Sequence, residues 1–190
     1  NPTHVYNGGD YFHPILIIEN NASCQLILHS QDSIEVIEII VDAGLNDDIC
    51  LGDSIFISAN GNGSSYVWHN SPFILDSFNQ TTVVFPDVSM MFYVTNTDGM
   101  CEGIDSIYIS VSDEIPVPTF TTLYNCYKDS MILIGNPGMS DVNFDWKWDI
   151  LGENLFTQNA YFEFDTIGQY LVELTVTNLD NHCDAIVHQL

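Results

Sequence analysis

The stretch that decides the fold is Phe164-Asp-Thr-Ile-Gly-Gln-Tyr-Leu-Val-Glu-Leu-Thr-Val-Thr-Asn-Leu-Asp-Asn-His-Cys183. From Tyr170 to Thr177 polar and apolar residues alternate, and this period of two is typical of a β-strand with one buried face. A polar turn and a cysteine follow the alternation. The stretch therefore predicts a strand that begins at an aromatic residue and ends in a turn closed by Cys183.

The same pattern occurs in two earlier parts of the chain. Residues 6–24 match it, with one inserted residue, when Cys24 is set on Cys183. Residues 85–101 form a shorter copy that also ends on a cysteine. Internal repetition of this kind indicates a tandem array of one structural unit.

The front of the unit recurs as well, because residues 48–57 match residues 125–133 around Cys50 and Cys126. No such front precedes residue 1. We therefore expect three parts, listed by residue range: 1–41 as the C-terminal half of a truncated unit, 42–112 as a full unit and 113–190 as a second full unit.

The five cysteines follow these repeats. Each full unit has one cysteine near its front and one near its end, so we expect the disulfides Cys50–Cys101 and Cys126–Cys183. Cys24 is then the rear cysteine of the truncated unit and is unpaired within these residues. Closing loops of about 50 residues stabilises each unit by about 4 kcal/mol in the chain-entropy model, and such bonds belong to an oxidising compartment. Free buried thiols are the alternative interpretation.

Short alternating stretches separated by turn residues, such as residues 54–58 and 104–111, predict an all-β fold. Their spacing is typical of β-sandwiches, here arranged in tandem as elongated beads on a string. No stretch of helical length shows a 3.6-residue period, and none reaches the roughly 18 consecutive apolar residues of a membrane span.

Aromatic residues recur at matching places in the repeats. Trp68 and Trp148 lie on short mid-unit strands, where a sandwich needs a large side chain between its sheets. We expect both in the core, together with the tyrosines of the repeated strands, Tyr11, Tyr93 and Tyr170. The functional alternative is that these aromatic residues line a sugar-binding face.

The charge balance excludes two kinds of partner. The chain has 2 Lys and Arg residues against 26 Asp and Glu residues, a net charge of −24. Binding to nucleic acid or to an anionic bilayer would be repulsive. We therefore expect no nucleic-acid partner and no direct membrane insertion.

Two motifs carry a resemblance to a known family. Residues 47–55 resemble the front pattern D-x-x-I-C-x-G-D-S-[IV] with one residue fewer before Ile49, and residues 168–178 follow the rear pattern G-x-Y-x-V-x-L-x-V-T-N. The full units resemble the PKD and PKD-like immunoglobulin-fold repeats that occur in tandem in giant secreted proteins of the Bacteroidetes. The W-D-F-G-D-G turn of that family is degraded here at residues 148–153, so the third part resembles a divergent PKD domain and the middle part a PKD-like one.

The resemblance implies a role and a modification. Proteins with such arrays include gliding-motility adhesins, surface filaments and spacers of secreted hydrolases, commonly exported by the type IX secretion system. These bacteria attach O-glycans at a D-[ST]-[AILMTV] motif. Five matches mark candidate sites: Ser33, Ser54, Ser106, Ser130 and Thr166.

A search for catalytic chemistry finds no converging constellation. The six histidines are dispersed, and no nucleophile elbow, zinc, phosphate-loop or dinucleotide motif occurs. We expect no enzyme and no cofactor. Asp47 and Asp48 lie at a junction between units, where a calcium ion is a minority hypothesis.

The leading hypothesis is an extracellular, cell-surface stalk or filament segment of a large secreted adhesin or filament protein. Its partners are expected to be further repeats of the same chain, with surface glycans or other filament subunits as further candidates. Two alternatives stay open: a carbohydrate- or surface-binding module, and a spacer region of a secreted hydrolase.

Overall fold

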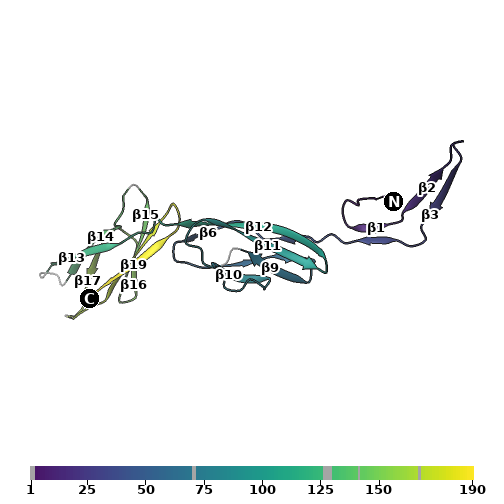
Figure 1. Ribbon diagram of the computed structural model, residues 1–190. Helices are drawn as coiled ribbons and strands as arrows, with labels where there is room; N and C mark the ends of the chain where they lie inside the picture. The colour runs from purple at the N-terminus through teal and green to yellow at the C-terminus, as the bar shows by residue number, and fades with distance from the viewer. Residues whose placement is uncertain (1–2, 70–71, 126–129, 141, 167) are drawn as a thin grey trace. The chain divides into compact units, whose positions relative to one another are not determined.

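A computed structural model describes residues 3–69, 72–125, 130–140, 142–166 and 168–190, and the regular elements within these ranges are all strands (Figure 1). The all-β prediction is therefore confirmed. None of the described residues belongs to a helix that is long and apolar enough to cross a membrane.

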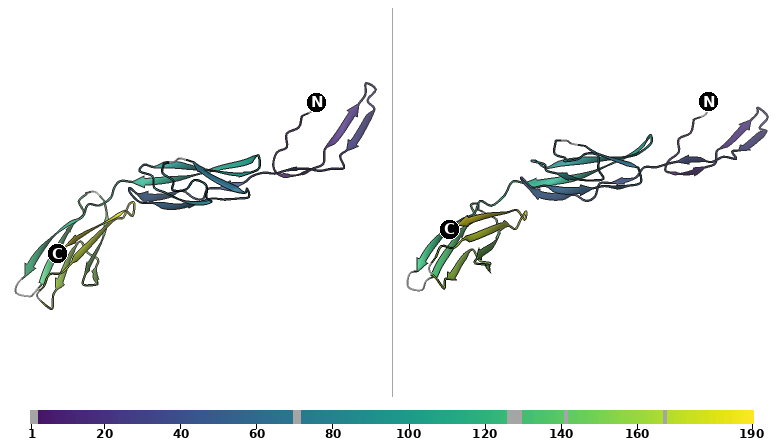
Figure 2. Two further views of the ribbon diagram at one scale, coloured as in Figure 1. Left: turned by 60° about the horizontal axis from the view of Figure 1, so that its bottom comes forward. Right: turned by 90° about the horizontal axis from the view of Figure 1, so that it is seen from below.

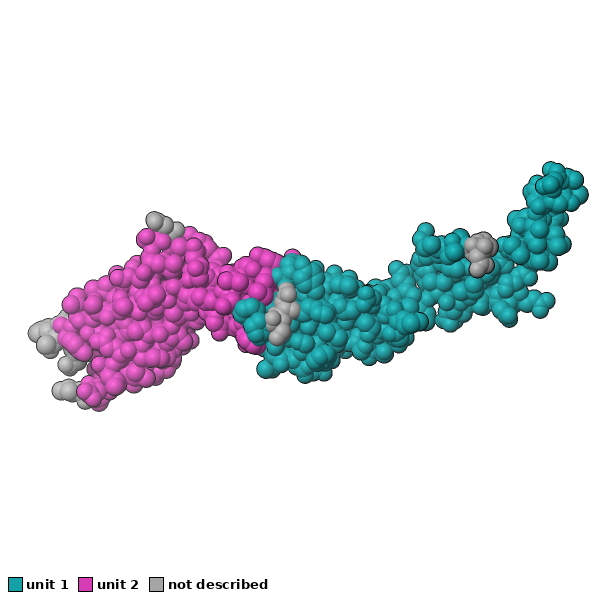
Figure 3. Space-filling view, in the orientation of Figure 1, with its two compact units in different colours: residues 1–45, 56–84, 91–107 teal, residues 46–55, 85–90, 108–190 magenta. Residues whose placement is uncertain are grey.

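The chain divides into two compact units (Figure 3). Unit 1 comprises residues 1–45, 56–84 and 91–107, and unit 2 comprises residues 46–55, 85–90 and 108–190. The repeat boundaries expected from the sequence, after residues 41 and 112, stay a prediction.

The N-terminal part of unit 1 consists of two antiparallel strand pairs: β2 (Ile15–Glu19) with β3 (Gln25–His29), and β1 (Asp10–Phe12) with β4 (Ile34–Val36). Every residue of β2 and β3 is exposed. Their seven aliphatic side chains, which lie on both faces, are 46% to 56% exposed. Figure 2 shows this hairpin as a sheet of two strands.

The rest of unit 1 is built around β11 (Met90–Asp98), which pairs antiparallel with β9 (Ser65–His69) and also neighbours β12 (Cys101–Ser112). A second layer pairs β7 (Ile55–Ser58) with β10 (Thr81–Val84), and β5 (Val41–Asp42) pairs with β8 (Asn60–Gly61). Alternation gives β11 one buried face, with Phe92 and Val94 at 0% exposure. Trp68 on the neighbouring strand β9 is 1% exposed.

Unit 2 contains two antiparallel sheets. The first has the order β13 (Thr119–Asn125), β14 (Ser130–Asn136), β17 (Asn159–Glu163). The second has the order β16 (Glu153–Leu155), β15 (Phe144–Ile150), β18 (Val172–Asn178), β19 (Asp184–Gln189). In the same unit β6 (Asp47–Cys50) pairs in parallel with the last residues of β12.

The core of unit 2 lies between these two sheets. Trp148 of β15 is 0% exposed, and its ring meets Phe120 of β13 edge to face at 5.1 Å. The indole Nε1 donates a hydrogen bond to the carbonyl oxygen of Thr157 at 2.8 Å, so the buried polar atom is satisfied. Val172, Leu174 and Val176, the buried face of β18, complete the same cluster.

A tyrosine fixes the entry to β18. The Tyr170 hydroxyl donates to the Thr166 carbonyl oxygen at 2.6 Å, and its ring stacks on Phe164 at 4.5 Å. Two antiparallel sheets, a buried tryptophan on the third strand and a tyrosine hydroxyl bonded back to the backbone are hallmarks of an immunoglobulin-like sandwich. Unit 2 has this fold, as the sequence predicted.

Two of the expected core aromatic residues are in fact exposed. Tyr93 is 43% exposed, because its neighbours Phe92 and Val94 take the buried face of β11 and alternation turns Tyr93 outward. Tyr11 is 61% exposed, because nothing described covers its face of β1. Its hydroxyl donates to Glu35 at 2.8 Å, and this bond to the carboxylate raises the pKa of Tyr11.

Replacing Trp148 by alanine will remove the largest side chain between the two sheets of unit 2. We expect the free energy of unfolding to fall by about 3–5 kcal/mol. Denaturant titration followed by far-ultraviolet circular dichroism measures this change. The matched control is Phe156→Ala, since Phe156 is 65% exposed and its loss should cost less than about 0.5 kcal/mol. Equal effects of the two variants would contradict the placement of the core.

Candidate functional site: a disulfide-bonded linker

The linker between β12 and β13 runs from residue 113 to residue 118 and reads Asp-Glu-Ile-Pro-Val-Pro. Pro116 and Pro118 are buried, and their rings fix the backbone φ angle. The amide of Val117 donates to the carbonyl oxygen of Pro137 at 3.0 Å. The two prolines therefore stiffen the linker, and the bond to Pro137 holds it against the C-terminal end of β14.

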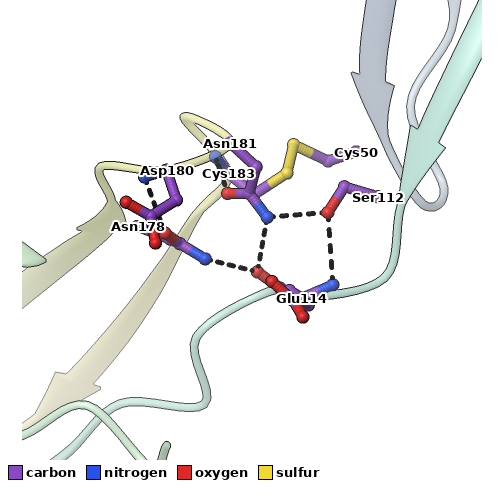
Figure 4. The surroundings of a disulfide bond; sticks show 7 residues. All are labelled: Cys50, Ser112, Glu114, Asn178, Asp180, Asn181 and Cys183. Carbon is purple, nitrogen blue, oxygen red and sulfur yellow. Dashed lines mark hydrogen bonds between the residues drawn. A yellow bond between two sulfur atoms is a disulfide. The ribbon is translucent and has the colours of Figure 1, made fainter. Parts of the chain in front are cut away.

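A disulfide joins β6, the strand paired with the end of β12, to the turn after β18 (Figure 4). Cys50, the last residue of β6, is bonded to Cys183 in the β18–β19 turn, with the two Cα atoms 5.7 Å apart. Cys50 lies opposite Ser112, the last residue of β12. Cys183 is 0% exposed. The bond thus connects the sheet that contains β6 and β12 to the sheet that contains β18 and β19.

Side-chain amides of the β18–β19 turn hold the first residues of the linker (Figure 4). Asn181 Nδ2 donates to Ser112 Oγ at 2.7 Å and to the Glu114 carbonyl oxygen at 2.9 Å. The same carbonyl oxygen accepts a bond from Asn178 Nδ2 at 3.1 Å. The Glu114 amide donates to Ser112 Oγ at 3.4 Å. Linker and turn are therefore joined by hydrogen bonds beside the covalent bond.

The turn itself is shaped by the same amides. Asn178 is 0% exposed, and its Oδ1 accepts a bond from the Asp180 amide at 2.9 Å. Asn181 Oδ1 accepts a bond from the Cys183 amide at 2.9 Å. His182 has a φ of 60°, in the left-handed region that few residues other than glycine adopt. These bonds fix the turn in which Cys183 meets Cys50.

The expected disulfide pairs Cys50–Cys101 and Cys126–Cys183 are wrong, because Cys183 is bonded to Cys50 and Cys101 is exposed and unbonded. Cys126 lies outside the described residues. Cys101 begins β12, whereas Cys50 lies opposite the residue that ends β12. Eleven residues of strand span roughly 35 Å, far beyond the Cα separation that a disulfide allows.

The repeated sequence pattern shows whether a cysteine lies near the front or the rear of a unit in sequence, but not at which end of the folded sandwich it lies. The strand order is the information that would have assigned each cysteine to an end of the sandwich. A parallel first strand such as β6 ends where the last strand β12 ends, whereas the turn before β12 lies at the strand's opposite end. Cys24, predicted to be unpaired in these residues, is exposed and unbonded.

The candidate glycosylation sites differ in accessibility. Ser33, Ser54 and Thr166 are exposed, and Ser106 is half-buried within β12. Ser130 is 3% exposed, and its hydroxyl is buried at the start of β14, so the folded chain has no room for a glycan there. The prediction for Ser130 is therefore wrong: Ser130 is buried at the start of β14, although alternation places it on the same face as the exposed Ile132 and Ile134.

The calcium hypothesis for Asp47 and Asp48 gains no geometric support. Both are neighbours on β6, where successive side chains point to opposite faces of the strand. Among the residues that the structure describes, no three His, Cys, Asp or Glu side chains gather closely enough to hold a metal ion.

Comparison with solved structures returns tandem immunoglobulin-domain proteins. The chain matches the N-terminal eight Ig domains of Down Syndrome Cell Adhesion Molecule over 92% of its own length and 34% of theirs, with 10% identity and a TM-score of 0.46. It matches extracellular domains 3–5 of Drosophila OTK over 90% and 68%, with 12% identity and a TM-score of 0.38. It matches domains A168–A170 of titin over 86% of its own length and 76% of theirs, with 15% identity and a TM-score of 0.34.

The chain spans about a third of the first of these structures. Neither a protein-family model nor a curated protein sequence matches the chain. The immunoglobulin-like assignment rests on the strand order and on the buried tryptophan and tyrosine described above.

Removing the disulfide will destabilise the chain. For a sequence separation of 133 residues the chain-entropy model gives about 5 kcal/mol. Under oxidising conditions, we expect Cys183→Ser to lower the free energy of unfolding by up to this amount. We also expect the free energy of unfolding of this variant not to change when reductant is added. Cys101→Ser is the matched control and should leave both unchanged, since Cys101 is exposed and unbonded. Equal losses in the two variants would contradict the observed pairing.

Replacing Asn178 by alanine will remove the bond that its Oδ1 accepts from the Asp180 amide and one of the two bonds that the Glu114 carbonyl oxygen accepts, the other coming from Asn181. Each such hydrogen bond contributes about 0.5–1.5 kcal/mol, so we expect a loss of stability of about 1–3 kcal/mol. Denaturant titration of the oxidised variant measures it. Asn159→Ala, at an exposed position of β17, is the control and should change stability by less than about 0.5 kcal/mol.

Proposed function

We propose that the chain is a non-catalytic stalk or filament segment of a larger secreted cell-surface adhesin or filament protein. The observation that carries this proposal is the Cys50–Cys183 bond across the linker. Tension applied to the two chain ends passes from Cys50 through the sulfur atoms to Cys183. The residues enclosed by the bond are then shielded from the force, which is the property that a stalk requires.

The proposed location is extracellular. Disulfides persist in oxidising compartments, and this one is fully buried at Cys183. A net charge of −24 keeps neighbouring chains apart and favours solubility at a cell surface.

The proposed domain organisation keeps the repeat ranges 1–41, 42–112 and 113–190. The hairpin β2–β3 supports the first range as an incomplete unit, because its apolar side chains are exposed on both faces. A two-stranded sheet is marginal by itself and needs further strands or a covering layer. In this proposal further repeats of the same chain supply that cover.

The finer assignment is to PKD-like repeats of a Bacteroidetes surface protein, exported by type IX secretion and acting in adhesion or gliding. It rests on the front and rear motifs of the sequence. O-glycans are proposed at Ser33, Ser54 and Thr166, which are exposed, and at Ser106, which is half-buried. Mass spectrometry of the native protein, with Ser130 as the buried internal reference, tests the modification.

One feature favours the alternative role as a carbohydrate-binding module. A surface hollow in unit 2 is lined by Tyr161, Phe164 and Tyr170 together with Glu153 and Glu163. Aromatic faces beside carboxylates are suited to stack on and hydrogen-bond a sugar ring. Titration of soluble glycans against the chain and against the Tyr161→Ala variant distinguishes the two roles. A binding module should show saturable binding that Tyr161→Ala weakens, whereas the stalk proposal expects no saturable binding.

Single-molecule extension through the two chain ends tests the stalk proposal. With the disulfide intact, we expect the fully extended length to be shorter than that of the reduced chain by roughly 440–480 Å, from 133 residues at about 3.3–3.6 Å each. Cys183→Ser without reductant should behave like the reduced chain, and Cys101→Ser like the oxidised one. Equal lengths in oxidised and reduced chains would refute the shielding on which the proposal depends.

A further inference from the structure

The surface hollow of unit 2 lies at the edge strands of both sheets and has a volume of about 670 Å³. Residues of β16, the first strand of one sheet, and of β17, the last strand of the other, line it. Its volume is within the roughly 300–1,000 Å³ of sites that bind small ligands. Its lining combines aromatic and acidic side chains, which are Tyr161, Phe164, Tyr170, Glu153, Glu163 and Asp165.

The aromatic side chains of the hollow differ in how much of their rings is free. The rings of Phe164 and Tyr170 are stacked with their centroids 4.5 Å apart, so each covers one face of the other. Tyr161 is 48% exposed, and alternation along β17 places it on the same face as Glu163. The open face of an aromatic ring attracts a cation because the ring quadrupole is negative there. Tyr161 therefore favours a positively charged ligand.

The three hydroxyl groups that line the hollow have no proton left for a ligand. The Tyr161 hydroxyl donates to Glu163 Oε1 at 2.6 Å. The Tyr170 hydroxyl donates its one proton to the Thr166 carbonyl oxygen at 2.6 Å. Thr166 Oγ1 lies 2.7 Å from the same Tyr170 oxygen and is therefore the donor of that bond. The side chains of the hollow thus offer acceptors and no donor.

Two of the carboxylates in the hollow are open to a ligand. Glu153 and Asp165 are both exposed. No residue in the described part of the chain forms a hydrogen bond or an ion pair with either carboxylate. No Lys, Arg or His lines the hollow. Negative charge is therefore gathered beside the aromatic rings without a cation of the chain to balance it.

The ligand that this lining fits must bring both hydrogen-bond donors and positive charge. The hydroxyl groups of a neutral sugar each donate and accept, so a sugar is matched best where the site supplies donors as well as acceptors. An ammonium group has three donors and no acceptor, and it is attracted by carboxylates and by aromatic faces. The inventory of the hollow thus favours an ammonium group over a neutral sugar.

We propose that the hollow binds the side chain of a lysine that a basic partner protein presents. The ammonium group donates to the open carboxylates of Glu153 and Asp165, and the methylene stem packs on the ring of Tyr161. The net charge of −24 attracts a basic partner and raises the rate of encounter.

This inference goes beyond the stalk role, since a stalk needs no ligand. A lysine site on the surface of unit 2 gives a stalk or filament a contact with a second protein. The extension experiment on Cys50 and Cys183 does not involve the hollow, so the failure of one proposal leaves the other standing.

The test is titration of the isotope-labelled 190-residue chain with Nα-acetyl-lysine amide, followed by nuclear magnetic resonance. We expect saturable shifts at Tyr161, Phe164 and Tyr170 that weaken when the salt concentration is raised. Nα-acetyl-norleucine amide is the matched probe, because it keeps the stem and lacks the ammonium group, and it should not saturate.

Variants separate the aromatic ring from the carboxylates. Tyr161→Leu should weaken binding of the lysine probe by about 2- to 5-fold through loss of the cation–π contact, whereas Tyr161→Phe keeps the ring and should bind as well as the unaltered chain. Glu153→Gln should weaken binding to a similar extent. Asp184→Asn is the control, since Asp184 is an exposed acid of the same unit that does not line the hollow.

Three results would overturn the proposal. The first is the absence of saturable shifts with the lysine probe, and the second is equal binding of the norleucine probe. The third is saturable binding of a neutral glycan in the hollow with no binding of the lysine probe, which would assign the hollow to a sugar. Circular dichroism of each variant confirms that a loss of binding is not a loss of folding.

Discussion

The structure depends on one constraint: the apolar face of a sandwich strand must be covered by a second sheet. β18 meets it by turning Val172, Leu174 and Val176 inward against Trp148. Burying such side chains contributes a few kcal/mol each, and together they set the spacing of the two sheets. The hairpin β2–β3 shows the same constraint unmet, because its apolar side chains have no covering layer among the described residues.

Once the sheets are fixed, their ends acquire definite neighbours. The polar turn after β18 brings Asn178, Asn181 and Cys183 to the start of the linker, where Ser112 and Glu114 accept hydrogen bonds from the two amides. Cys50 reaches the same place because β6 runs parallel to β12 and ends beside it. The mechanical role proposed for the chain follows from this meeting of three segments that are distant in sequence.

Much of the fold was predictable from alternation and repetition. The all-β class, the strand at residues 172–178 and the inward position of Trp148 follow from residue types and spacing alone. Tyr93 was misplaced because an aromatic side chain on a strand with an apolar neighbour on each side gives no sign of which face is buried. The disulfide was mispaired because repeats give equivalent positions, whereas pairing depends on which end of the sandwich each cysteine occupies. Only the parallel register of β6 with β12 decides this, and no local pattern encodes it.

The most direct test of the account is disulfide mapping of the 190-residue chain, digested without reduction after its free thiols are blocked. The account predicts one peptide pair that joins Cys50 to Cys183, with Cys24 and Cys101 both blocked. A peptide that joins Cys50 to Cys101 would contradict it, since the bond would then close within one sandwich and leave the linker without its covalent bridge.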